Sequence, residues 1–179
     1  MFFIAVRLRR GGEITLLIGD RYDMELEIRK AEDRDISRIL ELLSQVLEVH
    51  AAGRPDLFRS GTTKYNDAEL AEIIADSERP IFVGVRDGVV LGYAFCVFQR
   101  HRERNAPNYT TLYIDDLCVD EKSRGLRVGR SLYEYVLGFA KESGCYNVTL
   151  NVWACNESAM KFYEKCGLQV QKIGMEKIL

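Results

Sequence analysis

The sequence lacks the features that mark membrane, secreted and nucleic-acid-binding proteins. No apolar run approaches the roughly 20 residues that cross a bilayer. Near the start, the positive charges follow the apolar residues instead of preceding them, an order that is wrong for a secretory signal. Basic residues are not in excess, since 25 Lys+Arg against 27 Asp+Glu leave a net charge of -2, whereas proteins that hold duplex nucleic acid usually carry a basic surplus. We therefore expect no membrane and no nucleic-acid partner.

Cysteine pairs and metal-ligand spacings are also missing. The five cysteines are odd in number and form no C-x-x-C pair, and neither His50 nor His101 has a companion at metal-ligand spacing. Reduced thiols that pack as small apolar groups are typical of cytosolic proteins. This pattern predicts a cytoplasmic protein without a metal, and excludes a disulfide scaffold and a zinc finger.

Proline is scarce, and the domain organisation looks simple. Three prolines in 179 residues are too few for a flexible linker, and the 47% hydrophobic and 29% charged residues are typical of a globular domain. The one compositional seam lies near the start, where β-rich runs at 3–8 and 14–18 flank a turn-like segment and residues 19–23 break the pattern. We predict that residues 1–23 are an appendage forming a β-hairpin, and that 24–179 are the main domain, for which Met24 is a candidate native start.

From residue 25 onward the patterns predict alternating strands and helices. Asp33, Asn66 and Asn156 are candidate caps of the first, second and last helices, and Asp87-Gly88 is a strong hairpin turn. The resulting order, β-α-α-β-β-β-α-β-α-β, predicts a mixed α/β fold with an antiparallel hairpin and parallel crossovers. The predicted strands cover residues 25–30, 81–86, 89–99, 109–119, 146–153 and 168–176.

A glycine-containing loop joins the fourth of these strands to the third helix. Unpaired backbone N–H groups at a helix start bind phosphate well, and glycines let the backbone approach an anion closely. Three arginines add positive charge that suits a pyrophosphate. An ordinary loop with solvated arginines is the alternative, since neither a Walker ending nor a dinucleotide fingerprint is present. The candidate anion-binding residues are Arg124, Gly125, Leu126, Arg127, Val128, Gly129 and Arg130.

Three segments that occur in one order, 114–119, 124–130 and 156–167, resemble the motifs of the GNAT superfamily of acyl-CoA-dependent N-acyltransferases. The loop is similar to the family's pyrophosphate signature, R/Q-x-x-G-x-G/A. The resemblance implies the GNAT fold, a central mixed sheet flanked by helices, with acetyl-CoA as cosubstrate. Arg127 departs from the pattern, because the family usually has its first signature glycine there. We expect a modestly altered coenzyme affinity and not a lost site.

The resemblance also implies cofactor-binding residues outside the loop. In the family, the strand ahead of the loop splays from its neighbour and pairs its free backbone groups with the pantetheine arm. The matching residues are Leu117, Cys118 and Val119, although three residues of a normal buried strand would look the same. Asn156 can bind the same arm while it caps the last helix. A covalent route through Cys118 lacks a supporting His or Asp pattern.

Two catalytic residues follow from the resemblance. Asp115 matches an acidic residue proposed as general base, which takes a proton from the amine before it attacks the thioester. By the strand period of two, Asp115 and Asp116 should lie on opposite faces, with one carboxylate toward the substrate. Tyr163 matches the tyrosine that protonates the leaving thiolate. The alternatives are carboxylates satisfied by neighbouring loops and a tyrosine that only packs.

The sequence thus predicts an N-acetyltransferase that moves an acetyl group from acetyl-CoA directly to a primary amine. We expect this amine to belong to a small molecule, because the two carboxylates favour a cationic acceptor. A protein N-terminus or lysine is the alternative acceptor. A non-catalytic acyl-CoA sensor is the alternative function, and the edge of the N-terminal hairpin would allow a homodimer. The irregular segment 53–65 offers Asp56, Phe58 and Tyr65 as candidate substrate contacts.

Overall fold

The structure, a computed structural model, describes residues 4–8, 14–18 and 25–179. The two N-terminal runs are strands β1 (Ile4–Leu8) and β2 (Ile14–Ile18), which pair antiparallel in a two-stranded sheet. The predicted turn between them, the break at 19–23 and the candidate start Met24 lie outside the described residues.

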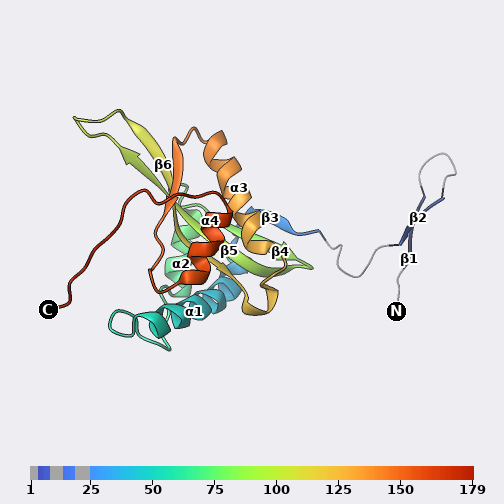
Figure 1. The fold of residues 1–179 in the computed structure, drawn as a ribbon. Coiled ribbons are helices and arrows are strands. Elements are labelled where there is room, and N and C mark those ends of the chain that lie inside the picture. The colour runs from blue at the N-terminus through green and yellow to red at the C-terminus, as the bar shows by residue number, and fades with distance from the viewer. Residues whose placement is uncertain (1–3, 9–13, 19–24) are drawn as a thin grey trace.

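A five-stranded mixed sheet organises the rest of the described chain (Figure 1). Its strands are adjacent in the order β3-β4-β5-β6-β7, antiparallel from β3 to β6 and parallel between β6 and β7. The parallel pair needs a crossover, and a helix supplies it. The strands are β3 (Glu27–Lys30), β4 (Ile81–Arg86), β5 (Val89–His101), β6 (Tyr109–Val119) and β7 (Asn147–Leu150).

Helices cover both faces of this sheet. On one face, α1 (Ile36–Gly53) and α2 (Asp67–Ala75) bury a cluster that includes Leu42 and Leu70 against Tyr93. On the other face, α3 (Val128–Glu142) buries Leu132 and its neighbours in a second cluster, to which α4 (Glu157–Lys165) adds partly buried residues. The result is a three-layer α/β/α arrangement whose two cores are separated by the sheet, as expected for helices that each carry one apolar stripe.

Local signals in the sequence set most of the element boundaries. Asn66 accepts a hydrogen bond from the backbone N–H of Glu69, whose side chain accepts from the backbone N–H of Asn66, so the predicted cap of α2 is confirmed as a capping box. Asn156 likewise caps α4. The Asp87-Gly88 turn is also confirmed, with positive φ at both residues as a two-residue hairpin turn requires.

The predicted cap of the first helix was wrong. Asp33 is the first residue of a 3-10 turn, η1 (Asp33–Asp35), which Glu32 caps, and α1 begins at Ile36. The reason is a tertiary contact, because Asp35 is buried and accepts two hydrogen bonds from the Arg29 guanidinium, at 2.7 and 2.9 Å.

Two strand predictions near the C-terminus also need correction. The strand predicted at 146–153 is shorter, since β7 covers only Asn147–Leu150. The strand predicted at 168–176 does not form within the described range 25–179, and beyond the partly buried Leu168 its apolar side chains are exposed, with Val170 at 69% and Ile173 at 77%. A β-rich pattern becomes a strand only where a neighbour pairs with it and covers its apolar face, and this segment lacks both.

Candidate active site

The last residues of β6 are no longer paired with β7. The pairing of β6 with β7 stops at Ile114, opposite Leu150, whereas the pairing of β6 with β5 continues to Val119. Residues 116–119 therefore have a strand partner on one side only within the described chain. This half-paired stretch holds the three predicted pantetheine contacts, and its backbone groups on the open side can bind an extended, amide-containing ligand.

A β-bulge sits where this stretch begins. Cys96 lies opposite Ile114 and Phe95 lies opposite Asp116, so Asp115 is the additional residue of β6. A bulge breaks the two-residue alternation and changes the aim of the side chains beside it. The prediction that Asp115 and Asp116 lie on opposite faces depends on an unbroken strand, and the bulge removes that premise.

The two adjacent carboxylates have different surroundings. Asp115 is exposed, and its Oδ2 lies 2.7 Å from Nζ of Lys64, in the segment between α1 and α2. Asp116 is half-buried and accepts a hydrogen bond of 2.7 Å from the hydroxyl of Tyr93. Burial raises the pKa of Asp116 above its usual range, although the bond from Tyr93 opposes that rise. Asp115 is therefore the more accessible of the two carboxylates.

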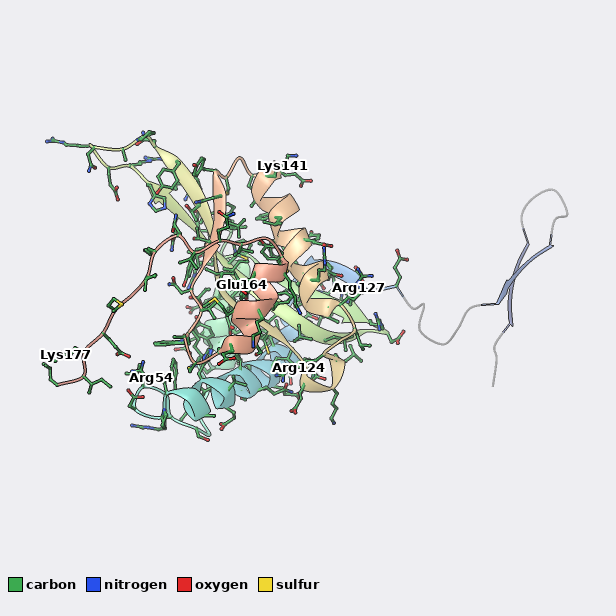
Figure 2. All side chains as sticks on the ribbon, viewed as in Figure 1. Arg54, Arg124, Arg127, Lys141, Glu164 and Lys177 are labelled. Carbon is green, nitrogen blue, oxygen red and sulfur yellow. The ribbon has the colours of Figure 1, made fainter. Side chains whose placement is uncertain are left out.

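The predicted anion-binding loop leads directly into α3. After a 3-10 turn, η2 (Glu121–Ser123), the chain passes through Arg127, which has a left-handed φ of 64° and is the N-cap residue of α3. Figure 2 shows Arg124 and Arg127 at the end of α3 opposite Lys141. Because the first backbone N–H groups of a helix lack intrahelical partners, this end presents donors together with two exposed guanidinium groups.

Gly129 brings three of the predicted segments together. A Cβ at this position would lie 3.2 Å from Cγ2 of Val119 and 3.6 Å from Cζ of Phe162. The start of α3, the end of β6 and α4 therefore meet around one residue without a side chain. The loop, the half-paired strand and the helix that carries Tyr163 thus form one continuous site.

Tyr163 lies half-buried on α4. Its ring centroid is 5.0 Å from that of Phe162 and 6.4 Å from that of Tyr133. Burial, and to a lesser extent the charge of Asp116, raises the pKa of Tyr163 above its usual range. The phenol is therefore protonated at neutral pH and can donate a proton or a hydrogen bond.

The surroundings of Cys118 do not favour a role as a nucleophile. Its thiol is buried and donates to the backbone oxygen of Leu42 at 3.6 Å. Burial raises the pKa of Cys118 to about 12. A protonated thiol in this position is a poor nucleophile, because the thiolate is the reactive species.

Contacts that sequence analysis missed fix the loop to α1. The carboxylate of Asp120 is buried and accepts hydrogen bonds from Gln45, at 3.0 Å, and pairs with Arg38, also at 3.0 Å. Gln45 in turn accepts from the backbone N–H of Glu121 at 3.2 Å. No local signal marks Gln45, because the polar face of a helix gives no sign of the loop that it contacts.

The segment between α1 and α2 contacts both the sheet and the C-terminal part of the chain. Tyr65 stacks on Phe95, with centroids 6.0 Å apart, and Phe58 meets Trp153 edge-on at 5.5 Å. Asp56 is bound by Arg54, which also donates to Glu176 and lies 5.5 Å from the ring of Trp153. Of the three candidate substrate contacts, Tyr65 is the one that stacks on β5 beside the bulge.

A surface cavity of about 470 Å³ lies between α1 and the start of α2. Tyr65 contributes to its lining, but none of the predicted catalytic or cofactor-binding residues does. It is therefore separate from the site that the end of β6, the loop and α4 form. Its lining residues are Ser37, Leu40, Glu41, Ser44, Thr63, Tyr65, Asn66 and Asp67.

Among the described residues, no helix combines the length and apolar character that a bilayer crossing demands. The same residues contain no group of three or more His, Cys, Asp or Glu side chains placed to hold a metal ion.

Relatives of known name resemble this chain over most of its length. A glucosamine 6-phosphate N-acetyltransferase of Trypanosoma brucei brucei is 29% identical over 149 residues, which is 83% of this chain and 92% of that protein. A thialysine N-epsilon-acetyltransferase of Bos taurus is 26% identical over 79% of this chain and 83% of that protein. The match to a glucosamine 6-phosphate N-acetyltransferase of Arabidopsis thaliana is 37% identical but spans only 36% of this chain and 42% of that protein.

The fold and the family are assigned by two further comparisons. The crystal structure of the BH1408 protein from Bacillus halodurans superimposes with a TM-score of 0.81 at 30% identity, over 86% of this chain and 99% of that one. The family model described as "Acetyltransferase (GNAT) family" matches residues 29–168, from β3 to just beyond α4. The chain therefore belongs to the GNAT family of acetyltransferases, and is an N-acetyltransferase with the α/β fold of that family.

Proposed function

We propose that this protein transfers an acetyl group directly from acetyl-CoA to the primary amine of a small molecule. The observation that supports this most strongly is the half-paired stretch of β6, which ends where the loop into α3 begins. An extended arm can bind along the strand while its diphosphate binds the helix start. The small-molecule acceptor is supported by the relatives, which are named for glucosamine 6-phosphate and thialysine.

The residues present fit this coenzyme. Backbone groups of Leu117, Cys118 and Val119 would pair with the pantetheine arm, and Asn156 at the start of α4 would contact it as well. The donors and guanidinium groups of the loop would bind the diphosphate, from Arg124 through Arg130. Bound acetyl-CoA supplies the activated acetyl group as a thioester.

Asp115 and Tyr163 would carry the two proton transfers. The Asp115 carboxylate, directly or through a water molecule, takes a proton from the acceptor ammonium, and the free amine then attacks the thioester carbonyl. As the tetrahedral intermediate collapses, the C–N bond is retained and the C–S bond breaks. The Tyr163 hydroxyl gives its proton to the leaving thiolate, and the attacking nitrogen, which still carries one proton too many, returns that proton to the Tyr163 phenolate or releases it to solvent, so that the neutral amide and free CoA result.

The state of the cysteines is consistent with a reducing compartment. All five cysteines are free thiols, with Cys155 exposed. Since free thiols persist where glutathione and thioredoxin keep them reduced, we propose a cytoplasmic location.

The test is thiol release from acetyl-CoA in the presence of a panel of small primary amines, with the acetylated product identified by mass spectrometry. We expect Asp115→Asn to lower kcat about 100-fold, as for loss of a general base, with CoA affinity by calorimetry unchanged. Asp33→Asn, which removes an exposed carboxylate on η1, is the matched control. Saturable CoA binding with no thiol release for any amine would favour a sensor, and no binding at millimolar CoA would overturn the assignment.

A further inference from the structure

The ion pair between Lys64 and Asp115 lies at the point where the acceptor amine must arrive. Nζ of Lys64 is 2.7 Å from Oδ2 of Asp115, and the two side chains are 46% and 33% exposed. The residues are 51 positions apart, so the pair is created only by folding the α1–α2 segment against β6. An acceptor ammonium that approaches Asp115 takes the place now held by the Lys64 ammonium.

Lys64 is positioned by aromatic contacts and stays charged. Its Nζ lies 5.3 Å from the ring centroid of Tyr65, which stacks on Phe95 beside the bulge. Burial lowers the pKa of Lys64, but the hydrogen bond to Asp115 and the charges around it together more than compensate, so the pKa lies above its ordinary value. The Lys64 side chain therefore keeps its charge beside Asp115.

Displacement creates an unfavourable arrangement for a purely cationic acceptor. The acceptor ammonium would pair with the Asp115 carboxylate and leave the Lys64 ammonium without an anionic partner. The two ammonium groups would then repel each other at close range. Arg54, in the same segment as Lys64, is already bound to Asp56 and Glu176. An acceptor that carries both an ammonium and an anionic group replaces one ion pair with two.

We infer that Lys64 is the binding residue for an anionic group of the acceptor. The preferred substrate is then a zwitterionic or amino-phosphate small molecule, whose amine binds Asp115 and whose carboxylate or phosphate binds Lys64. This inference rests on the proposed function and narrows its substrate class. The two carboxylates alone would favour simple cations such as polyamines, and the presence of Lys64 changes this expectation.

The experiment compares amines that differ only in the anionic group. Suitable pairs are lysine and cadaverine, O-phosphoethanolamine and ethanolamine, and glucosamine 6-phosphate and glucosamine. For each pair, kcat/KM is measured by thiol release, and affinity is measured by calorimetry in the presence of CoA, which cannot react. The carboxylate and phosphate pairs distinguish the two sources of the anion.

We expect the anion-bearing member of at least one pair to be preferred about tenfold or more by the wild-type protein, the effect of one partly exposed charge pair. Lys64→Met, which keeps the length of the side chain and removes its charge, should bring this ratio close to one. Lys64→Arg should preserve it. Lys141→Met, at the far end of α3, is the matched lysine control (Figure 2).

Three results would overturn the inference. One is a wild-type preference for the amine without the anion in every pair, by rate and by affinity. Another is an unchanged ratio in Lys64→Met, and the third is absence of selective binding for any anion-bearing amine. Failure of the proposed function is distinguishable from these, because it would appear as intact selective binding without thiol release for any amine.

Discussion

The hydroxyl of Tyr93 on β5 donates a hydrogen bond of 2.7 Å to the carboxylate of Asp116 on β6. Tyr93 is fully buried, and it lies in the core cluster formed by α1, α2 and the sheet. This bond holds the Asp116 carboxylate against the core and leaves that of its neighbour, Asp115, exposed. Asp115 is the additional residue of the bulge, which gives the two consecutive carboxylates different surroundings.

This arrangement predicts a pH-dependent gain in stability for Asp116→Asn. Burial raises the folded-state pKa of Asp116 above its unfolded value, so the stability that this group contributes is present at low pH and is lost as pH rises through the folded-state pKa. An amide avoids the cost of the buried charge and still accepts from Tyr93. Thermal unfolding from pH 4 to pH 8 should show a Tm advantage for the variant that grows with pH, and an advantage that stays constant would contradict the assignment.

Tyr93→Phe, which leaves the carboxylate without its donor, should be destabilising by about 1–3 kcal/mol.

Removal of the Tyr163 hydroxyl should slow the chemical step. We expect Tyr163→Phe to lower kcat about 100-fold, as for loss of a general acid, with little change in Tm because the ring remains. Tyr133→Phe is the control, since its ring lies 6.4 Å from that of Tyr163 and it loses the same atom. Turnover of Tyr163→Phe equal to wild type across the pH range would exclude the acid role.

Substitution of Arg127 separates backbone strain from charge. A non-glycine residue in the left-handed region costs about 1 kcal/mol or more, and Arg127 has a φ of 64°. Glycine removes this cost but gains freedom in the unfolded chain, so Arg127→Gly should change stability by less than about 1 kcal/mol.

Coenzyme affinity of the same variant tests what the arginine contributes. If the guanidinium binds the diphosphate, Arg127→Gly should weaken CoA binding by at most about tenfold, in keeping with the loss of one exposed charge. Arg127→Asn, which tolerates the left-handed conformation without extra backbone freedom, should behave alike. Much tighter CoA binding by calorimetry in both variants would show that Arg127 impairs the loop.

Two glycines predict opposite effects of alanine. A Cβ at Gly92 would lie 2.6 Å from the backbone oxygen of Cys118, so Gly92→Ala must separate β5 from β6 beside the site and should cost about 1–3 kcal/mol. A Cβ at Gly138 on α3 has no atom within 4 Å, and Gly138→Ala should be stabilising by about 0.5–1 kcal/mol. Denaturant unfolding measures both, and a Gly92→Ala protein as stable as wild type would mean that the strands are not this close.

The sequence by itself determined the parts of this protein that depend on neighbouring residues. The caps at Asn66 and Asn156, the Asp87-Gly88 turn and the loop into α3 each lie within a few positions of the residues they act on. Propensity, capping and periodicity operate over that range. The same locality made the GNAT motifs recognisable, and with them the fold and the family.

Only the tertiary structure decided which side chains meet across the chain. The bulge at Asp115, the pairing of that residue with Lys64 and the bond from Tyr93 to Asp116 join positions 18 to 51 residues apart. The absent strand at 168–176 has the same origin, because its pattern was suitable but no neighbour pairs with it. Periodicity records which face of an element is apolar, whereas the choice of partner depends on how all the elements pack together.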